Sequence, residues 1–413
     1  MAKNEGMSPV RGAERVVVLD VLRGVGIAGI LLVNVLIFSG VTDVFPSAPD
    51  TDMPVWDRAA EFLVTVFAEG KFITTLAFLF GLGFALQGMR ADERGQSSRR
   101  LLLKRICVLG LFGLVHAVFI WSGDILLMYA LMGLLLVFFR RRRPRTLLIW
   151  AGVCLTLPMI LLLFSIVSFA LFLTFGDPND VARATGGGGI PFFENLSESA
   201  REAYNSGSYV EMIGQRLREL IIVPLGLVVL GPFVLAMMLL GTAVARAGWV
   251  GDLEAHTTGL RRAAVVGLSV GLPLNVIYGV STIFDPASSG LWGLIGLACW
   301  LPGAPALAIG YMSSVTLLVL RRPENGFSSR FAAVGRLALS NYLTQSIVMT
   351  AIFYGLAIYG EVSVIVALLV AVALIALQIL ASPLYLKRFS YGPAEWLWRR
   401  LTYGRKPAAK GSA

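Results

Sequence analysis

Apolar stretches long enough to cross a lipid bilayer recur along almost the whole chain of 413 residues. The hydrocarbon core of a bilayer is about 30 Å thick, so a spanning helix needs about 20 consecutive, mainly apolar residues. Apolar residues make up 56% of the chain and charged residues only 15%, whereas about a quarter of the residues of a soluble protein are charged. The sequence therefore predicts an all-α polytopic membrane protein rather than a set of soluble domains.

We expect about ten membrane-spanning helices. They are residues 16–40, 60–89, 102–122, 124–139, 146–176, 216–245, 261–283, 288–320, 333–358 and 362–386. Together they predict a single transmembrane domain over residues 1–386, with one substantial outer loop at 177–215. An amphipathic tail rich in aromatic and arginine residues follows at 387–413 and is expected to lie along the inner membrane surface.

The formal net charge of +10 comes from basic residues that gather in every second loop. Twenty-eight of the 35 Lys and Arg residues lie in 1–15, 90–105, 140–145, 246–262, 321–336 and 387–413. This is the distribution of cytoplasmic loops, so we expect both chain termini in the cytoplasm. The same distribution argues against a nucleic-acid-binding surface, and we expect no nucleic-acid partner.

Two of the expected spans contain helix-breaking residues. Span 2 carries Glu69-Gly70-Lys71, which predicts an interfacial helix near 57–69 that turns into a true span at 72–89. Span 8 contains Pro302 and Pro305, which remove helix hydrogen bonds and predict a break or a kink. Non-helical backbone at membrane depth persists where protein or a water-filled cavity covers it. These interruptions therefore either line a site or serve helix packing.

One group of polar side chains is expected toward the cytoplasm. It consists of Asp20, Arg23 and Asn34 in the first span and of Arg336, Asn341 and Gln345 in the ninth. Asp20 and Arg23 are three residues apart and can pair on one helix face. Ionisable groups inside a bilayer are costly, so this group is a candidate substrate-binding site. The alternative is that its members form interhelical hydrogen bonds that hold the fold together.

A second group is expected toward the outside. His116 lies late in span 3, Asp124 follows a very short turn, and Tyr129 comes one turn into span 4. Glu69 and Lys71 come from the interruption in span 2. A histidine can act as a general base near neutral pH, with Asp124 or Glu69 orienting it. The alternative is a buried structural histidine beside an Asp124 that caps the next helix.

Other kinds of site lack support in the sequence. The three cysteines lie in apolar segments, and together with two histidines they give no metal-ligand spacing, so we expect neither a disulfide framework nor a metal site. Nucleophile elbows and phosphate-binding loops are also absent from the sequence.

Four stretches of the chain carry a resemblance to a known family. They are Leu19–Gly24 with Leu31–Asn34, Glu69–Phe72 running to Leu79–Phe84, His116 with Gly123–Leu126 and Tyr129–Ala130, and Ser340–Ser346 with Gly392–Arg399. In this order and over nearly the full length, the chain resembles the YeiB-like family of bacterial inner-membrane proteins, a domain of unknown function. The resemblance implies a multi-pass protein of the bacterial cytoplasmic membrane.

The opening of the chain is more distantly similar to the transmembrane acyltransferases, which include heparan-glucosaminide acetyltransferase and the acyltransferase-3 enzymes. That similarity implies transfer of an acyl group from cytoplasmic acyl-CoA to an acceptor on the far side of the membrane, by means of an essential histidine. Asn34 occupies the part of the first helix where acyltransferase-3 enzymes carry that histidine. In this chain His116, on another helix, would have to take its place.

Three functions remain open from the sequence. The first is a membrane-embedded acyltransferase with acyl-CoA as the donor substrate, bound by Arg23 and Arg336, while Lys71 or Asn34 polarises the thioester carbonyl. The second is a transporter or exporter of a small metabolite that uses the same polar residues. The third is a non-catalytic membrane scaffold. The expected partners are the lipid bilayer and a small-molecule substrate, with a homodimer as a further possibility.

Overall fold

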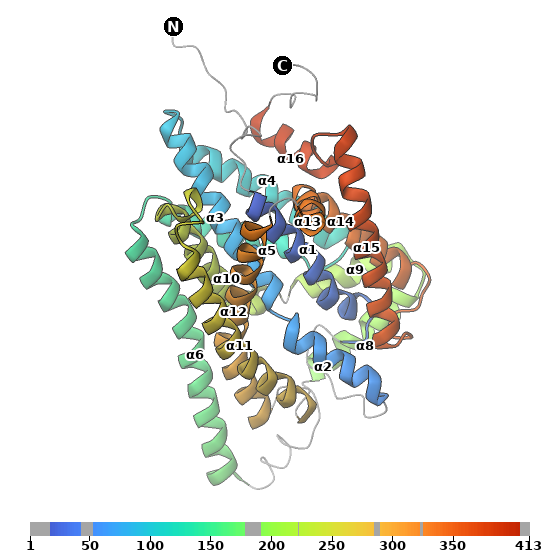
Figure 1. Ribbon diagram of the computed structural model, residues 1–413. Coiled ribbons are helices and arrows are strands. Elements are labelled where there is room, and N and C mark those ends of the chain that lie inside the picture. The colour runs from blue at the N-terminus through green and yellow to red at the C-terminus, as the bar shows by residue number, and fades with distance from the viewer. Residues whose placement is uncertain are drawn as a thin grey trace.

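The computed structural model describes residues 17–42, 53–177, 191–221, 223–284, 290–322 and 325–404. Over these residues every regular element is helical (Figure 1). The elements are α1 (Val17–Phe38), α2 (Val55–Phe67), α3 (Lys71–Glu93), α4 (Ser98–Phe119), α5 (Ile125–Phe139), α6 (Pro144–Phe175), α8 (Pro191–Asn205), α9 (Tyr209–Leu220), α10 (Val223–Arg246), η2 (Trp249–Gly251), α11 (Thr257–Phe284), α12 (Leu291–Arg321), α13 (Gly326–Arg336), α14 (Ala338–Phe353), α15 (Val364–Arg388) and α16 (Pro393–Tyr403). The predicted all-α fold is confirmed.

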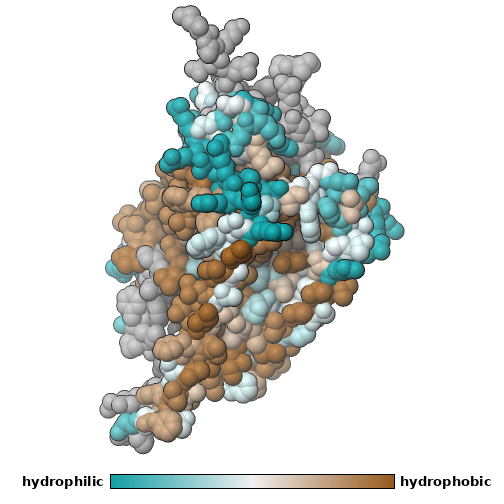
Figure 2. Space-filling view, turned by 90° about the vertical axis from the view of Figure 1, so that its left-hand side faces the viewer, coloured by the Kyte–Doolittle hydropathy of each residue, from teal (hydrophilic) through white to brown (hydrophobic). Residues whose placement is uncertain are grey.

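Seven helical segments in the described part of the chain are long and apolar enough to cross a membrane. They are α1, the stretch Val55–Glu93 that joins α2 to α3, α4, α6, α11, α12 and α15. The outer surface of α6 is apolar, with Phe164 71% and Ile149 66% exposed. Figure 2 shows the side where α6 lies as a broad hydrophobic face, with hydrophilic residues gathered at one end. Such a face is expected to contact lipid, so the protein is a multi-pass membrane protein.

Glycines allow two pairs of helices to pack backbone against backbone. A Cβ atom at Gly335 of α13 would lie 1.8 Å from the carbonyl oxygen of Asp20 in α1, and one at Gly24 would lie 2.0 Å from that of Phe331. Helices α3 and α10 meet in the same way, since a Cβ at Gly81 would lie 1.9 Å from the Met238 carbonyl oxygen. Small residues at such interfaces are typical of membrane helices. The α1–α13 contact brings Arg23 and Arg336 to the same region.

The interruption predicted in span 2 is present, because α2 ends at Phe67 and α3 begins at Lys71. Gly70 has a φ of +79°, a left-handed conformation that favours glycine. Span 8 differs from span 2, since α12 continues as an α-helix through Pro302 and Pro305. The proline-rich segment is therefore part of a helix rather than a gap between two helices.

Two other expected spans are each divided into two helices. Span 9 comprises α13 and α14, which Leu337 separates with the non-helical angles φ −106° and ψ 26°. Arg336 thus ends one helix while Asn341 and Gln345 belong to the next, so the polar residues of this span do not form one continuous helical stripe. Span 6 is divided in the same way, because α9 ends at Leu220 and α10 begins at Val223. The stretch expected as an outer loop, 177–215, contains the helix α8 and the first residues of α9.

Candidate functional site

A cavity of about 340 Å³ lies among α1, α3, α4, α5, α13, α14 and α16. Its volume is within the range of small-molecule binding sites, about 300–1,000 Å³. Its walls are formed by Arg23, Ile27, Leu76, Leu79, Phe80, Gly83, Phe84, Gln87, Leu102, Arg105, Ile106, Leu109, Ile125, Leu126, Tyr129, Gly335, Arg336, Ala338, Leu339, Tyr342, Glu395 and Trp398. Most of these side chains are apolar, and the charged ones come from α1, α4, α13 and α16.

Three arginines line one end of the cavity, namely Arg23, Arg105 and Arg336. Arg23 donates to the carboxylate of Asp20 at 2.9 Å, which is the i,i+3 ion pair predicted from the sequence. The Arg23 side chain remains 32% exposed. A guanidinium group presents five N–H donors in a fixed plane that matches phosphate and carboxylate groups. This end of the cavity can therefore bind an anion.

The C-terminal helix α16 covers the same end and is attached to two other helices (Figure 1). The Arg105 guanidinium lies 4.1 Å from the centre of the Trp398 ring and donates to the Tyr403 hydroxyl at 2.9 Å. The Glu395 carboxylate accepts from the backbone N–H of Ser340 at 3.0 Å and from the Ser340 hydroxyl. Because Glu395 and Trp398 also line the cavity, the tail forms part of the binding site.

The middle of the cavity is an apolar passage along one face of α4. Leu102, Ile106 and Leu109 follow one another at helical spacing and all line the cavity. Gly113 and His116 continue this face beyond the cavity, toward the end of α4. Arg105 and His116 are eleven residues apart on this helix, a rise of about 16 Å. The cavity therefore extends from the arginines toward the histidine.

His116 and Asp124 form a buried pair next to the far end of the cavity. The His116 Nδ1 atom lies 2.9 Å from Oδ1 of Asp124, and the two side chains are 0% and 1% exposed. These two atoms form no hydrogen bond of good geometry, so they make a close polar contact. The other oxygen, Oδ2, accepts from the backbone N–H of Leu127 at 2.5 Å and caps α5. Asp124 thus both faces the histidine and caps the helix.

The second ring nitrogen of His116 has unused bonding capacity. Nε2 is buried and has no hydrogen-bond partner within the described segments of the chain. Tyr342 links the imidazole to the cavity, since it lines the cavity and its ring centre is 5.1 Å from that of His116. The Tyr342 hydroxyl accepts from the backbone N–H of Ile125 at 3.4 Å. Tyr129 also lines the cavity and donates to the Ile73 carbonyl at 2.6 Å.

Glu69 and Lys71 lie in a separate polar cluster at the corner between α2 and α3. The Lys71 side chain is completely buried and its Nζ donates to the Thr65 carbonyl at 2.7 Å. The Glu69 carboxylate accepts from the Tyr278 hydroxyl of α11 at 2.8 Å. Neither residue lines the cavity. Of the two carboxylates that the sequence offered as partners of His116, the structure places Asp124 beside it.

Three further sequence candidates also lie outside the cavity wall. The Asn341 amide donates to the Val334 carbonyl at 3.1 Å. The Gln345 amide donates to Gln378 of α15 at 2.8 Å. These are interhelical hydrogen bonds, which was the structural alternative considered for this group. Asn34 is half-buried on α1 and does not line the cavity.

Helices α8 and α9 cover the turn between α4 and α5. The Glu219 carboxylate of α9 accepts from the Ser122 hydroxyl in this turn and from the Tyr204 hydroxyl at 2.8 Å. Burial raises the pKa of Glu219, and the hydrogen bonds from Ser122, Tyr204 and Gln215 act in the opposite direction. Arg216 is 2% exposed and donates to the Phe119 carbonyl at 3.0 Å. Hydrogen bonds therefore fasten α8 and α9 to the turn that leads to Asp124.

Sequence comparisons relate the chain to proteins of unknown function. Residues 244–405 match a family described as Protein of unknown function (DUF418). The chain is 35% identical to the uncharacterized protein YxaH of Bacillus subtilis, over 98% of each chain. It is 29% identical to the uncharacterized protein YeiB of Escherichia coli, over 94% of this chain and 96% of YeiB. The chain belongs to the YeiB-like family. No solved structure matches it significantly.

Some residues that line the cavity were not identified from the sequence as candidate site residues. Arg105 was counted only as a cytoplasmic charge, and Tyr342 and Trp398 only as parts of longer motifs. Arg105 is four residues before Leu109 and three after Leu102, so its position on an otherwise apolar helical face was a usable signal. The contact of α16 with α4 joins residues almost 300 positions apart, as in the Arg105–Tyr403 hydrogen bond, and local sequence patterns carry no information about it.

Proposed function

We propose that the protein is a membrane-embedded acyltransferase of the bacterial inner membrane. It would take an acyl group from cytoplasmic acyl-CoA and pass it to a hydroxyl or amine acceptor that arrives from the outer side. The observation that carries this proposal is one cavity that is lined both by three arginines and by Tyr342, whose ring lies beside the His116–Asp124 pair. Such a cavity fits a long substrate with an anionic head and an uncharged reactive end.

The arginines would hold the donor. Arg23, Arg105 and Arg336 would bind phosphate groups of CoA through charge-assisted hydrogen bonds. The apolar passage past Leu102 and Leu109 would take the uncharged pantetheine arm. This arrangement would place the thioester near Tyr342, at the end of the cavity that is next to His116.

His116 would act as the general base. Its Nε2 atom has no partner within the described chain and could remove the proton from the acceptor hydroxyl or amine. The acceptor atom would attack the thioester carbonyl, so that a new carbon–oxygen or carbon–nitrogen bond forms and the carbon–sulfur bond breaks. The proton would pass to the departing thiolate, which leaves as free CoA thiol. Asp124 would stabilise the imidazolium that forms in between.

The direct test uses the full-length protein in detergent. Binding of acetyl-CoA would be measured by calorimetry, and release of the CoA thiol with a thiol reagent. We expect Arg23→Gln with Arg336→Gln to weaken binding by tenfold or more, because each charge-assisted hydrogen bond contributes about 1.5–3 kcal/mol. Arg262→Gln is the matched control, since Arg262 is an exposed arginine at the start of α11, away from the cavity wall.

The proposal fails if acyl-CoA neither binds nor loses its acyl group. It also fails if the control variant loses as much affinity as the double variant. Flux of a small metabolite into sealed vesicles without any acyl-CoA would favour the transporter. If neither binding nor flux is found, and substitutions at Arg23, His116 and Asp124 change only folding, the protein is a scaffold.

A further inference from the structure

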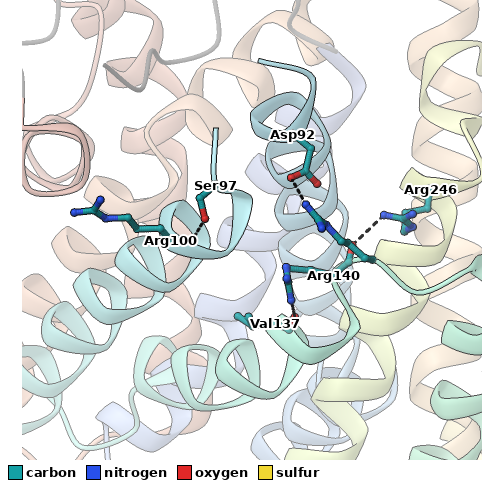
Figure 3. Close-up of polar contacts among 7 residues, drawn as sticks. Asp92, Ser97, Arg100, Val137, Arg140 and Arg246 are labelled. Carbon is teal, nitrogen blue, oxygen red and sulfur yellow. Dashed lines mark hydrogen bonds and ion pairs between the residues drawn. The ribbon is translucent and has the colours of Figure 1, made fainter. Parts of the chain in front are cut away.

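A second cluster of arginines lies where α5 and α10 end and where α3 approaches them (Figure 3). Arg246 of α10 donates through Nη1 to the backbone carbonyl of Arg140 at 2.9 Å. Arg140 donates to the Val137 carbonyl at 3.4 Å, which holds its side chain against the end of α5. Arg141 pairs with Asp92 of α3 at 3.0 Å. The Arg246 guanidinium thus lies against the backbone of Arg140, whose own side chain turns toward Val137.

These two arginines retain donors that the protein does not use. The Nε atoms of Arg140 and Arg246 are both buried and have no hydrogen-bond partner in the described residues. A buried donor without a partner costs about 1–3 kcal/mol, and more when the group is charged. Arg141, Arg142 and Arg143 follow directly in the sequence and are exposed, which adds positive charge around the pair. An anion bound at the exposed part of this cluster would reduce the repulsion among its positive charges.

The surface next to this cluster is apolar and faces the bilayer. Phe138, two residues before Arg140, is 74% exposed. Ile149 and Trp150 at the start of α6 are 66% and 46% exposed, and the Trp150 ring lies 5.7 Å from that of Phe139. Figure 2 shows the same transition on the side of α6, from a hydrophilic end to a hydrophobic face. A ligand for this place therefore needs an anionic head and apolar chains.

We propose that Arg140 and Arg246 form a binding site for the phosphate of an anionic phospholipid, with its acyl chains along Phe138 and Trp150. Basic residues at the ends of membrane helices attract anionic lipid head groups, typically with about 1 kcal/mol for each Lys or Arg. The site lies on α5, α6 and α10, whereas none of Arg140, Arg246, Phe138 and Trp150 lines the α4–α16 cavity. It is independent of the proposed acyl transfer.

Trp150 provides a local probe of the bound lipid. The protein would be placed in phosphatidylcholine vesicles that contain a small fraction of lipid with brominated acyl chains, either phosphatidylglycerol or phosphatidylcholine. Bromine quenches nearby tryptophan, and subtraction of a Trp150→Phe variant isolates Trp150 from the other tryptophans. We expect phosphatidylglycerol to quench Trp150 with about thirtyfold higher apparent affinity than phosphatidylcholine, since two arginines contribute.

Three variants and the control Arg262→Gln separate a specific site from a generally positive surface. Arg140→Gln with Arg246→Gln should remove the preference, and Arg246→Gln alone should reduce it while keeping the contact of Arg140 with Val137. Arg140→Lys with Arg246→Lys should keep a preference of the same sign. Arg262→Gln should change nothing. Equal quenching by both lipids, or an equal loss in Arg262→Gln, would overturn the proposal. Loss of the preference on adding millimolar inorganic phosphate would assign the site to free phosphate instead.

Discussion

The membrane domain contains two buried polar pairs that use their hydrogen bonds differently. At the α2–α3 corner, Lys71 bonds to the Thr65 carbonyl and Glu69 accepts from Tyr278, so each charged group has a partner from the protein. In the other pair, His116 faces Asp124 at 2.9 Å, and its Nε2 has no partner in the described chain. The first arrangement is that of a structural contact, and the second leaves one atom available for a substrate.

The surroundings of the two pairs strengthen this difference. Tyr342 connects His116 to the cavity, whereas Glu69 and Lys71 lie outside its wall. Buried charges that are fully bonded stabilise an arrangement of helices, and their loss is costly because a charge remains without a partner. A buried histidine with an unused nitrogen beside a cavity is instead suited to proton transfer. The comparison therefore predicts that substitutions at His116 and Asp124 lower activity, whereas substitutions at Glu69 and Lys71 lower stability.

The largest expected effect on activity is that of His116→Ala. Release of CoA thiol from acyl-CoA should fall by about 10²–10⁴-fold, the usual contribution of a general base. The assay would use purified protein, and thermal unfolding in detergent would show whether the variant remains folded. A folded variant that keeps wild-type turnover would exclude His116 as the base.

Lys71→Met should have the largest effect on stability. It removes the hydrogen bond from the Lys71 ammonium group to the Thr65 carbonyl and the positive charge near the Glu69 carboxylate, and a hydrogen bond to a charged group contributes about 1.5–3 kcal/mol. Thermal or denaturant unfolding in detergent would measure the loss. The double variant Glu69→Gln with Lys71→Met should recover part of it, because the unpaired charge is removed. If Lys71→Met is as stable as the wild type but inactive, Lys71 belongs to the catalytic machinery after all.

Asp124→Asn should separate the two roles of this side chain. The amide oxygen can still accept from the Leu127 N–H and cap α5, so we expect stability to change by less than about 1 kcal/mol. The negative charge beside Nδ1 of His116 is lost, so turnover should fall by about tenfold or more. Turnover and unfolding would be measured on the same preparation. A large loss of stability with normal turnover per folded molecule would leave only the capping role.

Gln345→Leu should have the smallest effect. Gln345 donates to the Ile27 carbonyl at 3.3 Å and to Gln378 at 2.8 Å, and hydrogen bonds between membrane helices typically contribute about 0.6 kcal/mol. We expect a loss of about 1 kcal/mol in unfolding free energy and unchanged acyl-CoA affinity. The result sharpens the distinction between the two faces of α14, one toward α15 and one toward the cavity. Weaker acyl-CoA binding in a stable variant would place Gln345 in the site.

Much of the fold could be predicted from local sequence patterns. Long apolar runs predict membrane helices because the bilayer offers no other partner for backbone N–H and C=O groups. The interruption at Gly70, the short helix α8 and the turn before Asp124 were also predictable, since each depends on residues close together in the chain. The division at Leu337 was not, because the expected span 333–358 joins the last residues of α13 to α14, and the end of α13 packs backbone to backbone against α1.

The candidate site depended much more on tertiary structure. The Asp20–Arg23 and His116–Asp124 pairs follow from short sequence separations, three residues in one case and a tight turn in the other. Sequence separation does not show which polar residues face the cavity. Arg336 lines the cavity, whereas Asn341 and Gln345 bond to neighbouring helices.

The sequence by itself thus determined that this chain crosses a membrane as helices, and which rare ionisable residues it carries there. Only the tertiary structure decided that α16 returns to cover Arg105 and that Glu69 is separate from His116. The physical reason is the range of the forces involved. Bilayer insertion depends on the composition of each segment, whereas a cavity depends on how faces of helices distant in the chain pack together.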